Sequence, residues 1–178
     1  MNIWVTTDLH LCHDRDFLYG PRGFTSAESH AKAIVRNWNK IVQPEDIVYV
    51  LGDCVLNDDV KGIAMLKQLN GTKYLAIGNH DSDARLKRYE EAKVFADMQF
   101  AYRITHNGMK LHLTHYPTMT GNFDSRNPTF NISGHTHNQD KWDLWEHGIY
   151  NAALDAHNNA PVNLDTVVSD IRNKLTNK

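Results

Sequence analysis

The chain has 178 residues, with 19 Lys and Arg against 21 Asp and Glu and a formal net charge of −2. This length fits one domain, residues 1–178, with a core large enough to need neither a disulfide nor a structural metal. The small net charge gives no field that would attract nucleic acid or an anionic membrane, and no apolar run approaches the roughly 18 residues that span a bilayer.

The first half of the chain alternates short apolar runs with helical patterns. We predict strands at residues 2–7, 47–51 and 74–77 and helices at residues 58–69 and 83–93, with a polar loop over residues 8–24. A further helix should begin at Thr25, because Thr25 and Glu28 form a capping-box pattern and Phe24 can pack before it as a hydrophobic staple.

The second half is mostly β. Residues 99–106 and 109–114 flank Asn107-Gly108, a strong signal for a hairpin, and residues 129–133 read as a strand. Residues 141–153 predict a second hairpin that turns at His147-Gly148, and Asn163 should cap a last helix. The order of elements predicts an α/β fold in which helices cover the outer faces of sheets.

Five of the predicted strands end in residues that can bind metal. The candidates that follow these strands are Asp8, His10, Asp53, Asn79, His115, His135 and His137. Ligands of α/β proteins gather beyond the carboxyl ends of strands, so the five loops should converge if the strands are neighbours. Seven ligands are too many for one open site and suit two ions that share a bridging carboxylate.

Each motif alone has a simpler explanation. An Asp-x-His sequence is typical of a capped turn, and an isolated histidine such as His115 is more often a packed or surface residue than a ligand. The ordered set favours metal, as does the histidine content, since the 11 histidines outnumber the 5 prolines.

In this order the motifs resemble those of the calcineurin-like metallophosphoesterase family. They are Asp8-x-His10, Gly52-Asp53, Gly78-Asn79-His80-Asp81, His115 and Gly134-His135-x-His137, and they span residues 8–137. The resemblance implies a four-layer αββα sandwich, with two mixed β-sheets face to face and helices outside.

The resemblance also implies the roles of these residues. One ion would be held by Asp8, His10 and His137, the other by Asn79, His115 and His135, and Asp53 would bridge them. A metal-bridging hydroxide would attack in line, His80 would act as general acid and Asp81 would orient its imidazole. Oxygen and nitrogen ligands suit two divalent ions, for which we expect Mn²⁺, with Fe, Ni²⁺ or Zn²⁺ as alternatives.

One difference from the protein phosphatases that resemble this family argues against a protein phosphatase. Protein serine/threonine phosphatases of this kind continue from Gly-Asp with Val-Asp-Arg-Gly, whereas Gly52-Asp53 is followed by Cys54-Val55-Leu56-Asn57. The chain looks more like small phage and bacterial members of the family. We therefore expect a phosphodiesterase that acts on a nucleotide-like or other small phosphate ester. The alternatives are a phosphomonoesterase or nuclease of the same family, or a metal-bound scaffold for a protein partner.

The first loop holds two candidates for substrate binding, His13 and Arg22. An arginine there could form a fork on a phosphate, although a solvated loop charge is an equal alternative. His112 should lie on a sheet face, whereas His30, His106, His147 and His157 have no motif around them and are expected at the surface or in turns. Cys12 and Cys54 are expected as reduced thiols of a cytoplasmic protein. The sequence does not indicate an oligomeric state.

Overall fold

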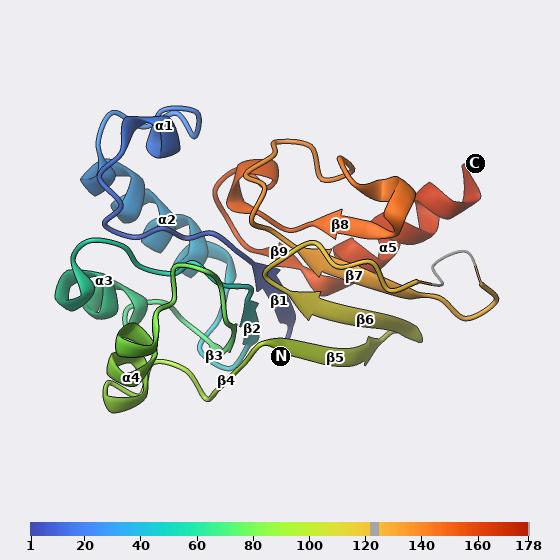
Figure 1. The fold of residues 1–178 in the computed structure, drawn as a ribbon, viewed down its shortest axis with the longest axis horizontal. Coiled ribbons are helices and arrows are strands. Elements are labelled where there is room, and N and C mark those ends of the chain that lie inside the picture. The colour runs from blue at the N-terminus through green and yellow to red at the C-terminus, as the bar shows by residue number, and fades with distance from the viewer. Residues whose placement is uncertain (122–124, 178) are drawn as a thin grey trace.

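The computed structural model describes residues 1–121 and 125–177. Two mixed β-sheets lie face to face with helices packed against them, which confirms the predicted α/β fold class (Figure 1).

The first sheet has five strands in the order β4-β3-β2-β1-β9. Strands β1 to β4 are parallel and β9 runs antiparallel to β1. Their bounds are β1 Ile3–Thr6, β2 Ile47–Val50, β3 Thr72–Ala76, β4 Asp97–Gln99 and β9 Val162–Asn163.

The second sheet has four strands in the order β5-β6-β7-β8. The predicted hairpin is present as antiparallel β5 and β6, whereas β6, β7 and β8 are parallel to one another. The bounds are β5 Ala101–His106, β6 Met109–Thr114, β7 Thr129–Ser133 and β8 Ile149–Asn151. Only Phe100 separates β4 from β5, so the chain passes from one sheet to the other at this residue.

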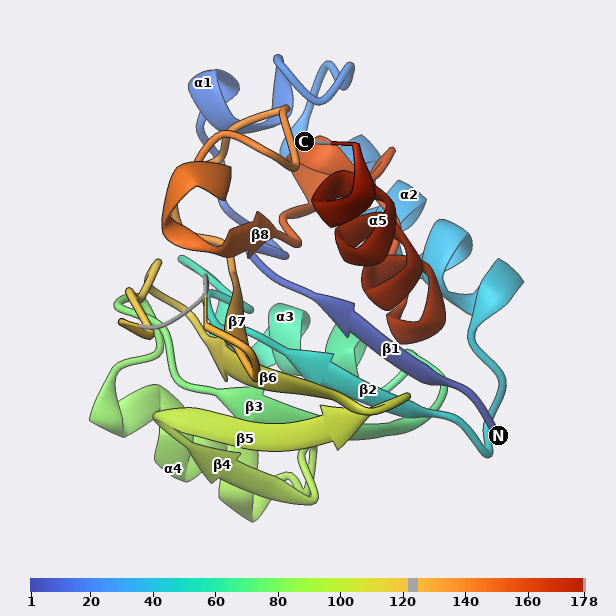
Figure 2. The ribbon, with the colours of Figure 1, turned by 90° about the vertical axis from the view of Figure 1, so that its right-hand side faces the viewer.

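The helices are α1 Asp16–Tyr19, α2 Ala27–Ile41, α3 Asp59–Leu66, α4 Asp83–Glu91 and α5 Leu164–Thr176, with short 3₁₀ helices η1 Trp145–His147 and η2 Leu154–Ala156. Side chains alternate across a strand, so Val48 and Val50 of β2 pack against α2 and α3, while Tyr49 and Leu51 face the core between the sheets. Helix α5 adds Val167 and further side chains to that inner core and runs beside β1 (Figure 2).

Three local predictions are wrong. Residues 16–19, expected within a polar loop, form helix α1. The N-cap of helix α2 is Ser26, one residue after the expected Thr25, and Ser29 rather than Glu28 closes the capping box. The second hairpin does not form: residues 145–147 are 3₁₀ helix η1, which Gly148 ends in a left-handed conformation, and β8 pairs parallel with β7. The buried indole of Trp145 stacks on Phe130 and holds η1 over the core.

Candidate metal centre

The seven candidate ligands lie at one end of the sandwich, on loops that follow parallel strands. Asp8, Asp53 and Asn79 come after β1, β2 and β3, and their loops therefore leave the first sheet at the same edge. His115 and His135 come after β6 and β7 of the second sheet. The structure brings these loops together across the seam between the sheets.

One group of side chains surrounds Asp8. The Nε2 atoms of His10 and His137 lie 3.1 Å apart, and each is 3.7 Å from Oδ1 of Asp8. Ligands at about 2.0–2.2 Å from a metal are themselves about 3.0–3.6 Å apart. The spacing of Asp8, His10 and His137 therefore suits a single ion between them.

A second group surrounds His115. Its Nε2 atom lies 2.8 Å from Oδ1 of Asn79 and 3.1 Å from Nδ1 of His135. Asp53 stands between the two groups, because its Oδ2 atom is 3.6 Å from Nε2 of His115 and 3.7 Å from Nε2 of His10.

The donor set of the second group calls for a cation. The Nδ1 atom of His115 is 2.8 Å from the carbonyl oxygen of Leu51, which can only accept, so we assign the ring proton to Nδ1. In the neutral ring the Nε2 atom then has a lone pair, which faces Oδ1 of Asn79, Nδ1 of His135 and Oδ2 of Asp53. A bound divalent ion would use all four atoms as ligands, with His135 in the tautomer that leaves Nδ1 unprotonated.

The contacts of Asp8 indicate that the first group also needs a cation. Its carboxylate is fully buried, and Oδ2 accepts a hydrogen bond from the backbone N–H of His135 at 2.9 Å. Among the described residues, Oδ1 has no hydrogen-bond partner. Burial raises the pKa of Asp8, but His10 and His137 outweigh burial and bring that pKa below its usual range. Burial lowers the pKa of His10 to about 4, which leaves its imidazole neutral and able to ligate.

The backbone at these ligands is unusual. Five of the seven candidates have positive φ angles: Asp8 at 57°, His10 at 45°, Asp53 at 55°, His135 at 70° and His137 at 53°. Left-handed conformations of residues other than glycine cost about 1–3 kcal/mol each and concentrate at functional sites. The fold therefore holds the ligand loops in a geometry that local preferences disfavour.

His80 is placed at the edge of the centre. Its side chain is 43% exposed, and Nε2 lies 3.9 Å from Oδ2 of Asp53. The backbone N–H of His80 donates to Oδ1 of Asp53 at 2.8 Å, which fixes the start of this loop against the bridging carboxylate. The imidazole thus faces the open side of the centre.

Asp81 is placed differently from the prediction that it orients His80. Its Oδ2 atom accepts from the backbone N–H of Asp53 at 2.9 Å and of Gly78 at 3.0 Å, and its Oδ1 atom faces the N–H of Cys54 and the Tyr89 hydroxyl. Asp81 therefore ties the loops after β2 and β3 together.

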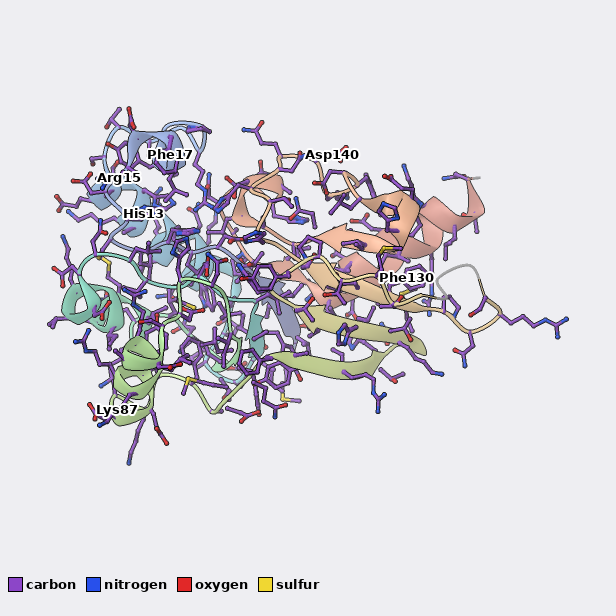
Figure 3. All side chains as sticks on the ribbon, in the orientation of Figure 1. His13, Arg15, Phe17, Lys87, Phe130 and Asp140 are labelled. Carbon is purple, nitrogen blue, oxygen red and sulfur yellow. The ribbon has the colours of Figure 1, made fainter. Side chains whose placement is uncertain are left out.

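A cleft of about 460 Å³ opens onto the centre. Its lining includes His80 and Asp53 together with four residues of the segment that carries α1, namely His13, Phe17, Leu18 and Pro21. Figure 3 labels His13 and Phe17 on this segment, and their rings are 6.0 Å apart. The Nδ1 atom of His13 lies 3.3 Å from Nδ1 of His10, so His13 contacts a candidate ligand from behind.

Arg22, predicted to bind substrate, is instead buried and already occupied. Its Nε and Nη2 atoms form a two-point ion pair with Asp155 at 2.9 and 2.7 Å. Nη2 also lies 3.0 Å from the backbone oxygen of Asp8, and Nη1 lies 3.0 Å from Nε2 of His30. The guanidinium is therefore directed into the protein, behind the ligands.

Two residues of this network were missed by the sequence analysis. His30, expected at the surface, is fully buried. Asp155, which no motif indicated, has its Oδ2 atom 3.3 Å from Nδ1 of His137. Burial raises the pKa of Asp155, but hydrogen bonds from His137 and Arg22 bring that pKa down to about 2. No local pattern could have found Asp155, since Arg22 is 133 positions away in the chain.

Comparison with known proteins identifies relatives of the chain. The family model for calcineurin-like phosphoesterases matches residues 1–171. The "Uncharacterized protein MJ1445" of Methanocaldococcus jannaschii is 33% identical over 174 residues, which cover 93% of this chain and 89% of that protein. The "Gene 66 protein" of Mycobacterium phage L5 is 32% identical over 92 residues, or 49% of this chain and 43% of that protein.

A solved structure shares the fold. The crystal structure of a protein of unknown function from Aquifex aeolicus matches with a TM-score of 0.74 at 24% identity, covering 94% of this chain and 98% of that one. None of the helices within residues 1–121 and 125–177 has the length and apolar character to cross a membrane. The extent of the family match and the identity to the archaeal relative establish that the chain belongs to the calcineurin-like phosphoesterase family.

Proposed function

We propose that this protein is a dinuclear metal-dependent phosphodiesterase that acts on a nucleotide-like or other small phosphate ester. The observation that carries the proposal is the position of Asp53, whose Oδ2 atom lies 3.6–3.7 Å from a histidine nitrogen of each group. One carboxylate between two sets of ligands is the arrangement that a pair of ions requires.

The residues present fit such ions. Asp8, His10 and His137 would hold one, Asn79, His115 and His135 the other, and Asp53 would bridge them. Carboxylate, amide and imidazole donors suit Mn²⁺, which we expect, and also Fe, Ni²⁺ or Zn²⁺. When bound, two such ions supply positive charge to a phosphoryl group and lower the pKa of water.

The chain's own contribution to the reaction lies in His80. The half-exposed imidazole lines the cleft, and its backbone is bonded to Asp53, which keeps the ring beside the place where a phosphoryl group would lie. A histidine at this position can donate a proton to the departing oxygen of an ester.

The cleft supports a small substrate with an apolar or aromatic group. Phe17 is 69% exposed and lines the cleft together with Leu18 and Pro21. An exposed ring beside a phosphoryl site can stack on a nucleobase or an aryl group. The protein is expected to be cytoplasmic, and the two free cysteines support that expectation.

A substrate screen with defined metals tests the proposal. Protein loaded with Mn²⁺ should hydrolyse bis(p-nitrophenyl) phosphate faster than p-nitrophenyl phosphate, and elemental analysis should find about two ions per chain. The reverse preference would make the protein a phosphomonoesterase. Turnover of neither compound with any of the four metals would contradict the proposed enzyme and leave the scaffold alternative.

A further inference from the structure

Arg22 and Asp155 form a buried ion pair directly behind the first group of ligands. The two side chains are 1% and 6% exposed, and they meet as a two-point fork at 2.7 and 2.9 Å. Arg22 comes from the loop before α2, and Asp155 comes from η2 near the other end of the chain. Two charges placed this deeply are costly unless every polar atom finds a partner.

The Nη2 atom of Arg22 has more neighbouring acceptors than hydrogens. Nη2 has two hydrogens, and they are used by Oδ2 of Asp155 at 2.7 Å and by the backbone oxygen of Asp8 at 3.0 Å. Nη2 is also 3.3 Å from Nδ1 of His137, the longest of its three contacts, so this nitrogen competes with two oxygens for two hydrogens. When Nε2 of His137 ligates an ion, the ring proton is on Nδ1, and Oδ2 of Asp155, 3.3 Å away, is the carboxylate acceptor on that side.

This assignment fixes the direction of the His137 ring. With Nδ1 protonated, the lone pair is on Nε2, which faces Nε2 of His10 and Oδ1 of Asp8. At the same time Arg22 holds the backbone of Asp8, whose φ angle of 57° is strained. The pair thus acts on two of the three candidate ligands of the first ion. The corresponding nitrogen of His115, in the second group, is held by the carbonyl of Leu51.

We propose that Arg22 and Asp155 are positioning residues that select the ligating nitrogen of His137 and hold the Asp8 loop in place for one of the two ions. This inference rests on the proposed dinuclear centre. It predicts an asymmetry: loss of the pair should weaken the ion held by Asp8, His10 and His137 and leave the ion held by Asn79, His115 and His135 in place. A purely structural clamp would lower the stability of the fold without such a preference.

The test uses full-length Asp155→Asn and Arg22→Lys proteins with a matched control. Asp170→Asn removes a carboxylate that accepts from Lys141 and Tyr150, away from the centre. Mn²⁺ binding would be measured by calorimetry and elemental analysis, and metal-free folding by circular dichroism. We expect one of the two ions to bind about 10–100-fold more weakly in both variants, while the control binds both as the wild type does.

The outcomes separate this inference from the proposed function. Wild-type protein that does not take up two ions would contradict the dinuclear centre itself. A wild type with two ions and variants that keep both affinities would overturn the positioning role. Equal weakening of both ions would identify the pair as a structural clamp and also overturn it. If Asp155→Asn does not fold, the Arg22→Lys variant is used instead, because it keeps the charge. Its affinities for the two ions are then compared with those of the wild type.

Discussion

The Nε2 atom of His115 lies 2.8 Å from Oδ1 of Asn79, and in the neutral ring with its proton on Nδ1 neither atom has a hydrogen to share. Such a contact between two acceptors is repulsive in an empty site and becomes favourable when a cation lies between them. Metal should therefore stabilise the fold. Mn²⁺ at about 100 times its dissociation constant should add about 2.7 kcal/mol to the free energy of unfolding for each ion.

Thermal unfolding with and without a chelator measures this effect. Asp53→Asn keeps the size of the side chain but removes the bridging charge. Mn²⁺ should therefore raise the melting temperature of this variant much less than that of the wild type, and the variant should bind Mn²⁺ more than about 10-fold more weakly. If this variant bound two ions as tightly as the wild type, Asp53 would not bridge them.

His80→Gln should lower kcat and leave the metal content unchanged. Loss of a general acid costs about 10²–10⁴-fold in rate. The loss should be largest for an alkyl phosphodiester, whose leaving oxygen needs a proton, and small for p-nitrophenyl esters, whose leaving group departs as an anion. An equal loss for both substrates would indicate that His80 does not donate the proton.

Phe17→Ala should raise KM for substrates with a nucleobase or aryl group by about 5–10-fold, because one stacking contact contributes about 1–1.5 kcal/mol. The KM for dialkyl phosphates such as dimethyl phosphate, which have no ring to stack, should change little. Phe100, which is 80% exposed and does not line the cleft, provides the control as Phe100→Ala. If the two variants behave alike, Phe17 does not contact substrate.

Gly78→Ala should disturb the centre through packing alone. A Cβ at this position would collide with Oδ1 of Asp53 and lie 2.7 Å from the Asp53 backbone nitrogen. We expect a loss of about 1–3 kcal/mol in stability together with weaker metal binding. Gly108→Ala, in the hairpin turn, meets no atom within 4 Å but has a φ of +78°. That control should lose about 1 kcal/mol and retain both ions.

Asp46 should make the fold sensitive to acid. Its carboxylate accepts from the backbone of Asn2 at 2.6 Å, from that of Gln43 at 3.0 Å and from the Trp4 indole at 2.9 Å. The hydrogen bond from Asn2 is the main cause that lowers the pKa of Asp46 to about 2. Because the folded pKa lies below the unfolded one, this stabilisation is complete above about pH 4 and is lost as the pH falls towards 2.

Denaturation with urea at pH 2–7 checks this prediction. Asp46→Asn should be less stable than the wild type at pH 7, by about 1–3 kcal/mol, and its stability should fall less steeply below pH 4. Parallel slopes for the two proteins would exclude Asp46 as a source of the acid sensitivity.

The sequence predicted six strands, β1, β2, β3, β5, β6 and β7, and the positions of the candidate ligands, because both depend on local patterns, whereas it did not indicate the short strands β4 and β9. The run at residues 129–133 has the bounds of β7, and the residues after β1, β2, β3, β6 and β7 do meet. The prediction of a second hairpin was wrong, because a left-handed glycine can end a 3₁₀ helix as well as form a hairpin turn. At Gly148 the burial of Trp145, a non-local effect, decides between them.

The sequence alone could not show the direction of side chains or the ion pairs between residues far apart in the chain. Asp81 follows His80 directly, yet its carboxylate turns back to the amides of Asp53 and Gly78, which adjacency in sequence does not reveal. Arg22 was assigned to substrate from its place in the loop. Its actual partner, Asp155, could be identified only after both ends of the chain were placed in space.

Each proposed ion takes ligands from both sheets: Asp8 and His10 with His137 in one case, and Asn79 with His115 and His135 in the other. Neither sheet can therefore bind an ion tightly on its own. Tight metal affinity should arise only after the two sheets have docked, which makes metal uptake a late event in folding. Removal of the ions should loosen the seam between the sheets before it unravels either sheet.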